Sequence, residues 1–394
     1  MKKLLLLIAN ILLVVSLFAQ KPSLTKAYNF FYDKDYDKAK EQIDLCTADE
    51  KLSAKAQTWL YKGNIEMLLA NREYSEKQKD ESYLIRYPDA PVEAFDAFEK
   101  AIAINPKVEA LDMMDANEAL KQLYPYLLVR GVDQLIAKDF AGAKATLYRG
   151  IKSYEMGTPQ YPMNGELYYY YAYALESLGE TDEMIRYYRK ALDDGSQNPY
   201  VFAKLIDYYK EANDRPNIEK TLALAKEKNP DDISVRLLEI DLAYWGGDSV
   251  KARKLVDQID PNTLKTPDEM VNLANFYIKE KRYEPAERLL RRANQLSPNN
   301  FVILYNLGVC CYNFSEEYFN RQNQLAIQQG VKEDIDAAKS LSDKYLADAA
   351  SYFEQARQLQ PGDLNLLSTL RAIYVRQQSP KADEIDAIIK QLEK

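Results

Sequence analysis

Apolar residues recur every three or four positions through most of this chain, which is the period of a helix that buries one face. Between Pro267 and Asn300 this pattern divides into two runs. The apolar positions are Met270, Leu273, Ala274 and Tyr277 in the first run and Ala286, Leu290 and Ala293 in the second. Small residues allow two helices to pack closely, and Pro298 favours the end of the second helix. The stretch therefore predicts a pair of antiparallel helices.

The same pattern returns with a period of about 34 residues. Equivalent positions fall at equal intervals on Ala191, Ala225, Ile259 and Ala293. This register resembles the tetratricopeptide repeat family, most clearly from Tyr168 to Pro298. A single helix pair cannot bury its apolar faces, so such pairs stack into a solenoid. The sequence predicts an all-α solenoid of about nine tetratricopeptide-like helix pairs, two with lengthened or inserted helices, and a carboxyl-terminal capping helix.

Two repeats depart from the regular spacing. In the second repeat, Trp59 and Gly63 fit the first helix, but the second helix begins only near Pro91, because a stretch that includes the charged run 72–81 is inserted between them. A helical segment over residues 107–122 is expected to follow. Near the carboxyl end, a longer insertion contains Gly330 and no proline. It predicts a long helical hairpin within residues 302–359, ahead of a capping helix over 381–394.

The first residues have the composition of an export signal. Lys2 and Lys3 precede an apolar run over residues 4–18 and then Ala19, which predicts a secretory signal peptide at 1–19. We expect an exported protein of the periplasm or cell envelope, with no membrane span after cleavage. The loop-like stretch 156–165 suggests a hinge between degenerate repeats at 20–156 and the solenoid at 164–394.

Charge and composition argue against several classes of function. The formal net charge is −8, and without Lys2 and Lys3 it is 50 minus 60, or −10. No long basic run is present, so nucleic acid is not an expected partner. The chain has no histidine, which removes the usual general base and a common metal ligand. We expect no catalytic residue, no metal and no cofactor, and we interpret the three cysteines as buried thiols.

The resemblance to the tetratricopeptide repeat family also implies a binding surface. In that family the first helix of each repeat lines a concave face that holds an extended peptide. The positions that correspond here are Asn64, Tyr169, Tyr173, Asn272, Asn275, Tyr305, Asn306 and Tyr312. Asn275 and Asn306 match two places of the family's carboxylate clamp, but Val271 stands where the clamp has lysine. The competing interpretation is that the asparagines are solvated and that most tyrosines pack in the core.

Three hypotheses of function follow from these patterns. The leading one is a non-enzymatic scaffold of the cell envelope that holds a peptide segment or folded partner on its concave face or on the projecting hairpin. An alternative is envelope glycan binding through the many tyrosines, with or without weak hydrolysis. The third is self-assembly into a homo-oligomer through the hairpin. Binding of isolated glycans and the mass of the purified protein in solution would distinguish them.

Overall fold

The computed structural model describes residues 21–157 and 162–393, and within them the chain contains helices and no strand. The predicted signal peptide and part of the predicted hinge lie outside the described residues. By internal packing the chain forms two units, one ending at Thr221 and the other beginning at Leu222. This boundary lies within α13 (Arg215–Lys228). No described helix combines the length and apolar character that crossing a membrane requires.

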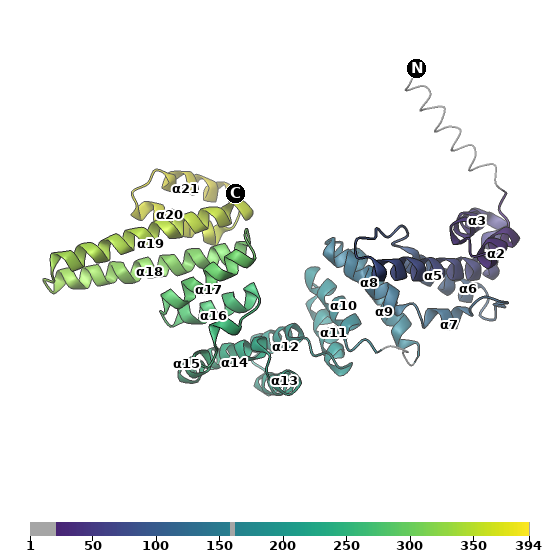
Figure 1. The fold of residues 1–394 in the computed structure, drawn as a ribbon, viewed down its shortest axis with the longest axis horizontal. Helices are drawn as coiled ribbons and strands as arrows, with labels where there is room; N and C mark the ends of the chain where they lie inside the picture. Colours follow the sequence, from purple (N-terminus) through teal and green to yellow (C-terminus); the bar gives the residue numbers. More distant parts are fainter. Residues whose placement is uncertain (1–20, 158–161, 394) are drawn as a thin grey trace, which may run out of the picture. The chain divides into compact units, whose positions relative to one another are not determined.

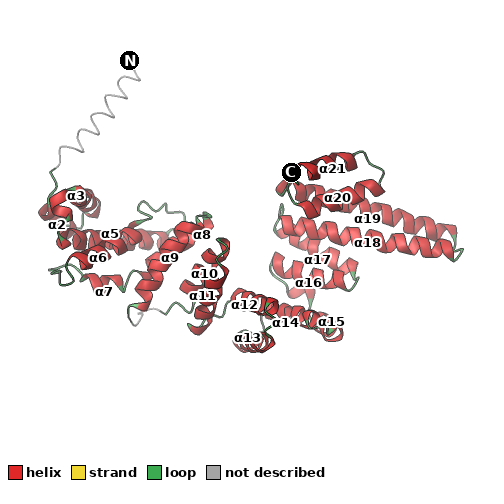
Figure 2. Ribbon diagram, turned by 180° about the vertical axis from the view of Figure 1, so that it is seen from behind, coloured by secondary structure: helices red, strands yellow, loops and turns green. Residues whose placement is uncertain are grey.

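Nine helix pairs follow one another along the described chain, as the sequence predicts (Figures 1 and 2). In order, the pairs are α2 (Leu24–Tyr32) and α3 (Tyr36–Ala48), α5 (Ala56–Lys79) and α6 (Ala90–Ile104), α8 (Tyr124–Ile136) and α9 (Phe140–Glu155), α10 (Glu166–Ser177) and α11 (Thr181–Asp193), α12 (Pro199–Glu211) and α13, α14 (Ile233–Trp245) and α15 (Ser249–Asp257), α16 (Pro267–Lys279) and α17 (Tyr283–Leu296), α18 (Phe301–Ile327) and α19 (Lys332–Leu359), and α20 (Leu364–Arg376) and α21 (Lys381–Leu392). Three short elements, α4 (Glu50–Ser53), α7 (Ala116–Leu120) and η1 (Pro261–Thr263), lie between pairs.

The turns inside successive pairs repeat one backbone conformation. Gly179, Asn213, Gly247 and Lys281 stand at equal intervals along the chain, and all four have positive φ angles, of 76°, 51°, 80° and 59°. A left-handed residue reverses the chain after the first helix and is least strained as glycine or asparagine. Asp214 and Asp248 follow two of these turns, and each carboxylate accepts a backbone N–H of the second helix. The repeat register is therefore a register of turns as well as of apolar positions.

Close packing inside the less regular pairs depends on glycine opposite a large side chain. A Cβ added to Gly63 would lie 2.5 Å from the ring of Phe98, and one added to Gly308 would lie 2.8 Å from the ring of Phe353. Gly131 stands in the same relation to Leu147, at 2.5 Å. Each bulky side chain thus fills the space that the missing Cβ leaves, and the two helix axes approach closely.

The long hairpin forms as predicted, and one other prediction is wrong. Helices α18 and α19 are 27 and 28 residues long and lie side by side along their length (Figure 1). By contrast, residues 107–122 do not form one helix, because only α7 is helical there. Val108 and Met113 are buried and anchor this segment as an irregular connection. Much of the insertion before Pro91 lengthens α5, which continues to Lys79.

Candidate functional site

Tyrosines from two neighbouring first helices form a partly exposed surface in the first unit. Tyr169 and Tyr173 lie one turn apart on α10, and Tyr200 comes from the start of α12. The ring of Tyr200 meets those of Tyr169 and Tyr173 edge-on, at centroid distances of 6.2 and 6.3 Å. We call these three residues the tyrosine face. Edge-to-face contacts hold the rings in defined orientations, so a ligand would meet a preformed aromatic surface.

One residue of the tyrosine face, Tyr200, is held in place by a carboxylate that it shares with Tyr188. Glu176 on α10 accepts hydrogen bonds from Tyr188 and Tyr200, at 2.7 and 3.0 Å, and pairs with Lys204 at 2.5 Å. Burial, and then the nearby carboxylate, raises the pKa of Tyr200 to about 12. Tyr168, Tyr171 and Tyr188 are buried, so part of the tyrosine set packs in the core, as the competing interpretation expects. Among the tyrosines of α10, Tyr169, Tyr170 and Tyr173 are partly exposed.

Asn64 is placed differently from the prediction. Its side chain is buried on α5, and its Nδ2 group donates to the carbonyl oxygens of Leu60 and Met114, at 3.0 and 3.1 Å. Its Oδ1 accepts from the backbone N–H of Met114 at 2.9 Å. The hydrogen bonds of the Asn64 amide to Met114 therefore hold the irregular connection before α7 in place. Asn64 is a structural residue and offers no free group to a peptide.

The other predicted residues lie in the second unit, on α16 and α18. Asn272 is exposed, and Asn275, Tyr305, Asn306 and Tyr312 are partly exposed. The Nδ2 group of Asn306 donates to the carbonyl of Val302 at 2.8 Å, one turn earlier in the same helix. The Tyr305 ring packs edge-on against Phe353 at 5.5 Å. Each residue keeps part of its side chain at the surface, and the partner-binding role stays a prediction.

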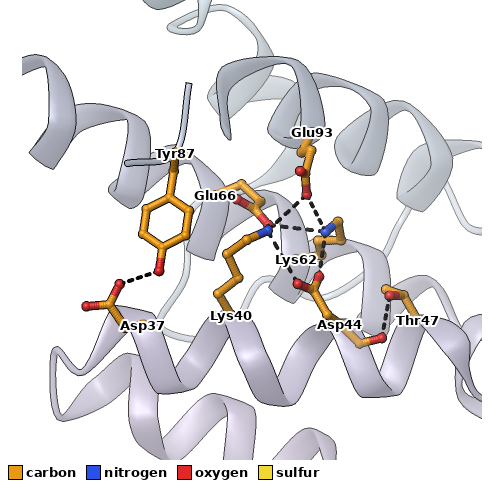
Figure 3. A network of polar contacts seen from close by, with 8 residues as sticks. All are labelled: Asp37, Lys40, Asp44, Thr47, Lys62, Glu66, Tyr87 and Glu93. Atoms are coloured by element: carbon orange, nitrogen blue, oxygen red, sulfur yellow. Dashed lines mark hydrogen bonds and ion pairs between the residues drawn. The ribbon is translucent and has the colours of Figure 1, made fainter. Parts of the chain in front are cut away.

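Charged side chains converge where α3, α5 and α6 meet (Figure 3). Lys40 Nζ lies 2.5 Å from Glu66 Oε1 and 3.1 Å from Glu93 Oε2, and Lys62 Nζ lies 2.7 Å from both Asp44 and Glu93. We call these five residues the ion-pair network. Oxygens of its three carboxylates lie within 4.8 Å of one another, a spacing that would suit a metal ion. The two ammonium groups already lie between those oxygens, so the arrangement fits an internal ion-pair cluster rather than a metal centre.

Burial sets the protonation of the ion-pair network. The Glu66 side chain has no exposed surface, and its Oε2 has no hydrogen-bond partner among the described residues. Burial raises the pKa of Glu66 to about 7, although Lys62 and Lys40 oppose the rise. Burial would also raise the pKa of Glu93, but the hydrogen bond and charge of Lys62 outweigh it and lower that pKa to about 2. The network therefore carries one carboxyl group that titrates near neutral pH.

A groove of the second unit was not among the predicted sites. It has a volume of about 1020 Å³ and lies between the start of α17 and the extended part of α18. Four amide side chains line it, namely Asn313, Asn320, Asn323 and Gln324. Their recurrence at helical spacing was visible in the sequence, but the regular repeat register assigns no binding position beyond Tyr312. We call this feature the amide groove.

The three cysteines are free and buried, as predicted. Burial raises the pKa of Cys46, Cys310 and Cys311. A raised pKa leaves little of the reactive thiolate at neutral pH, so these thiols act as small core residues.

Comparison with known proteins identifies tetratricopeptide repeats in two segments of the chain. The family model for the tetratricopeptide repeat matches residues 165–193 and 270–300. A search of proteins with curated functions finds no match. The chain is similar in structure to a tetratricopeptide repeat protein from Parabacteroides merdae, with 13% identity, a TM-score of 0.47 and coverage of 78% of this chain and 98% of that one.

Two further structural similarities involve eukaryotic proteins. Yeast Tom70 is 14% identical, with a TM-score of 0.45 and coverage of 93% of this chain and 90% of that one. A human IFIT1 dimer with PPP-AAAA is 17% identical, with a TM-score of 0.45 and coverage of 83% and 72%. Similarities this distant carry no information about what the present chain binds.

Proposed function

We propose that this tetratricopeptide repeat protein is a non-enzymatic scaffold of the cell envelope that holds an extended segment of a partner protein on its tyrosine face. The repeats support a role in protein interaction, because stacked helix pairs present long surfaces for binding. The amino-terminal pattern around Lys2, Lys3 and Ala19 supports export to the periplasm or envelope.

One observation carries the proposal. Tyr169, Tyr173 and Tyr200 meet across two consecutive first helices while staying partly exposed. Tyrosine gives a large contact area with few rotors, and aromatic anchors dominate the energy of many interfaces. Tyr168 and Tyr171, on the same helix as Tyr169 and Tyr173, are buried by packing. The three residues of the tyrosine face stay partly exposed.

Several features support a non-catalytic role. The chain has no histidine, and the cluster of three carboxylates in the described part of the chain is neutralised by Lys40 and Lys62. An acid–base pair needs one group free to exchange a proton with a substrate. The buried position of Glu66 offers no such access.

The test uses a photo-crosslinking amino acid at position 173 of the full-length protein in intact cells. We expect it to capture one or a few envelope proteins, and we expect the double variant Tyr169→Ala and Tyr173→Ala to lose the isolated partner by at least about tenfold in affinity. A probe at Tyr32, which is 70% exposed on α2, is the matched control. Capture of glycan alone, or only of a second copy of the chain, would reject the proposal in favour of the carbohydrate or self-assembly hypothesis.

A further inference from the structure

The amide groove exists because α18 is longer than the first helix of a regular repeat. Helix α16 has 13 residues and α18 has 27, so the last 14 residues of α18, from Phe314 to Ile327, extend beyond a regular first helix. At 1.5 Å per residue this part is about 21 Å long. That length accommodates about six residues of extended polypeptide. The groove is therefore a product of the insertion and lies outside the regular concave surface.

The four amide side chains that line the amide groove are not used in hydrogen bonds within the described part of the chain. Among the described residues, the side chains of Asn313, Asn320, Asn323 and Gln324 have no hydrogen-bond partner, in contrast to Asn64 and Asn306. An amide side chain offers both a donor and an acceptor, which is the pair of groups that a peptide backbone presents at every residue. Their spacing along α18 places polar groups at several points along the groove.

The floor of the groove is a packed cluster of aromatic rings. Phe314 lies 5.3 Å from Tyr283, 5.1 Å from Tyr318 and 4.3 Å from Tyr345, measured between ring centroids. Tyr318 and Tyr345 are almost parallel, with 2° between their planes. Tyr283, Phe314 and Tyr318 line the groove. Because this floor is already packed, an apolar side chain of a ligand would bind there without ordering it first.

The charges at the groove are balanced. Lys281 lies in the turn before α17, Glu284 lies in the first turn of α17, and Glu317 and Arg321 lie on α18. None of these four has an ion pair within the described chain, whereas the neighbouring Glu316 pairs with Arg376. Because the groove has equal numbers of positive and negative groups without an ion pair, it gives little net attraction to a polyanion such as nucleic acid.

We infer that the amide groove is a second binding site, which takes an extended, uncharged or mixed-charge polypeptide segment with an apolar side chain on the floor. The amides pair with the backbone of the segment, and the aromatic stack receives the side chain. This site lies wholly in the second unit and does not depend on the tyrosine face of the first unit.

A randomised library of dodecapeptides, selected against the full-length protein, tests the inference. The selected peptide should lose at least about tenfold in affinity with the triple variant Asn320→Ala, Asn323→Ala and Gln324→Ala. It should bind the matched control Gln355→Ala normally, because Gln355 is exposed on α19 and bonds to Ser351 in its own helix. It should also bind the tyrosine-face variant normally, which separates this inference from the proposed function. Circular dichroism establishes that the triple variant is folded.

Any of four outcomes would overturn the inference. The library could yield no binder, or the selected peptides could bind the triple variant as well as the parent protein. The third is an affinity that falls more than about tenfold between 50 and 500 mM NaCl, since the balanced charges at the groove predict a weak dependence on salt. The fourth is competition for the site by a single-stranded oligonucleotide.

Discussion

The ion-pair network and the amide groove use similar polar side chains in opposite ways. In the network, Lys62 touches three carboxylates, and its side chain is only 12% exposed. In the groove, Glu317 and Arg321 stand one helical turn apart and form no ion pair with each other or with another described residue. Burial forces charged groups to find partners inside the protein, while groups at an open groove stay available.

The comparison gives a criterion that separates structural polar residues from candidate binding residues in a repeat protein. A polar residue whose hydrogen-bonding groups are all used inside the chain contributes to stability. One that faces a groove with unused groups is a candidate for recognition. The predictions below test whether the two regions respond to substitution as this distinction requires.

The largest effect is expected from Lys62→Met. The change leaves Asp44, Glu66 and Glu93 with Lys40 as their only nearby ammonium group among the described residues. Removing one partner of a buried ion pair typically costs about 3–5 kcal/mol, because the other charge stays buried. Urea unfolding, together with hydrogen exchange of α3, α5 and α6, measures the loss locally.

The matched control is Lys38→Met on α3, the helix that also carries Lys40 and Asp44 of the ion-pair network. Lys38 and Asp35 form an exposed pair, with side chains 61% and 37% exposed, and exposed pairs of this kind contribute little to stability. Equal, small losses for both variants would mean that the network does not stabilise the first unit.

The pH dependence of stability tests whether the buried carboxyl groups of the ion-pair network contribute to the fold. The pKa of Glu66 is about 7 in the folded chain, above its usual value of 4.5. The folded state therefore binds this proton more tightly than the unfolded chain does, and stability falls as the pH rises from 4.5 through 7. Glu93, with a pKa of about 2, acts oppositely, and its contribution is lost as the pH falls from 4.5 towards 2.

We expect the loss between pH 5 and 8 to be about 1–3 kcal/mol, measured by exchange of amides in α5. The variant Glu66→Gln should remove most of this dependence, because its side chain does not titrate. A pH profile that is the same in Glu66→Gln and the parent protein would assign the titration to another group.

Much of the fold follows from the sequence because the repeat signal is redundant. Apolar positions, small residues and helix-ending prolines all report the same repeat period, so a few degenerate positions do not hide it. The hairpin was also predictable, since a long insertion with one glycine and no proline favours two long helices. Residues 107–122 were not, because burial of Val108 and Met113 overrides their local helical pattern.

The binding residues were less predictable for a different physical reason. The helical period correctly separates buried Tyr168 and Tyr171 from partly exposed Tyr169 and Tyr173. It cannot show that the amide of Asn64 meets Met114, a contact between segments far apart in the sequence. Whether a polar group is free depends on contacts between distant segments, which a periodic pattern does not encode.

Deleting one amide from each region makes the smallest and most direct comparison. Asn64→Ala leaves the backbone N–H and carbonyl of Met114 without their partner, and an unmet buried hydrogen bond costs about 1–3 kcal/mol. Asn320→Ala removes the same group from an exposed position of α18, where alanine also favours helix, so stability should change by less than about 0.5 kcal/mol. The midpoints of urea unfolding, monitored by hydrogen exchange in each unit, give both values. A destabilisation by Asn320→Ala as large as that by Asn64→Ala would show that this amide serves the fold, and the amide groove would lose a residue that its proposed role in binding requires to be free.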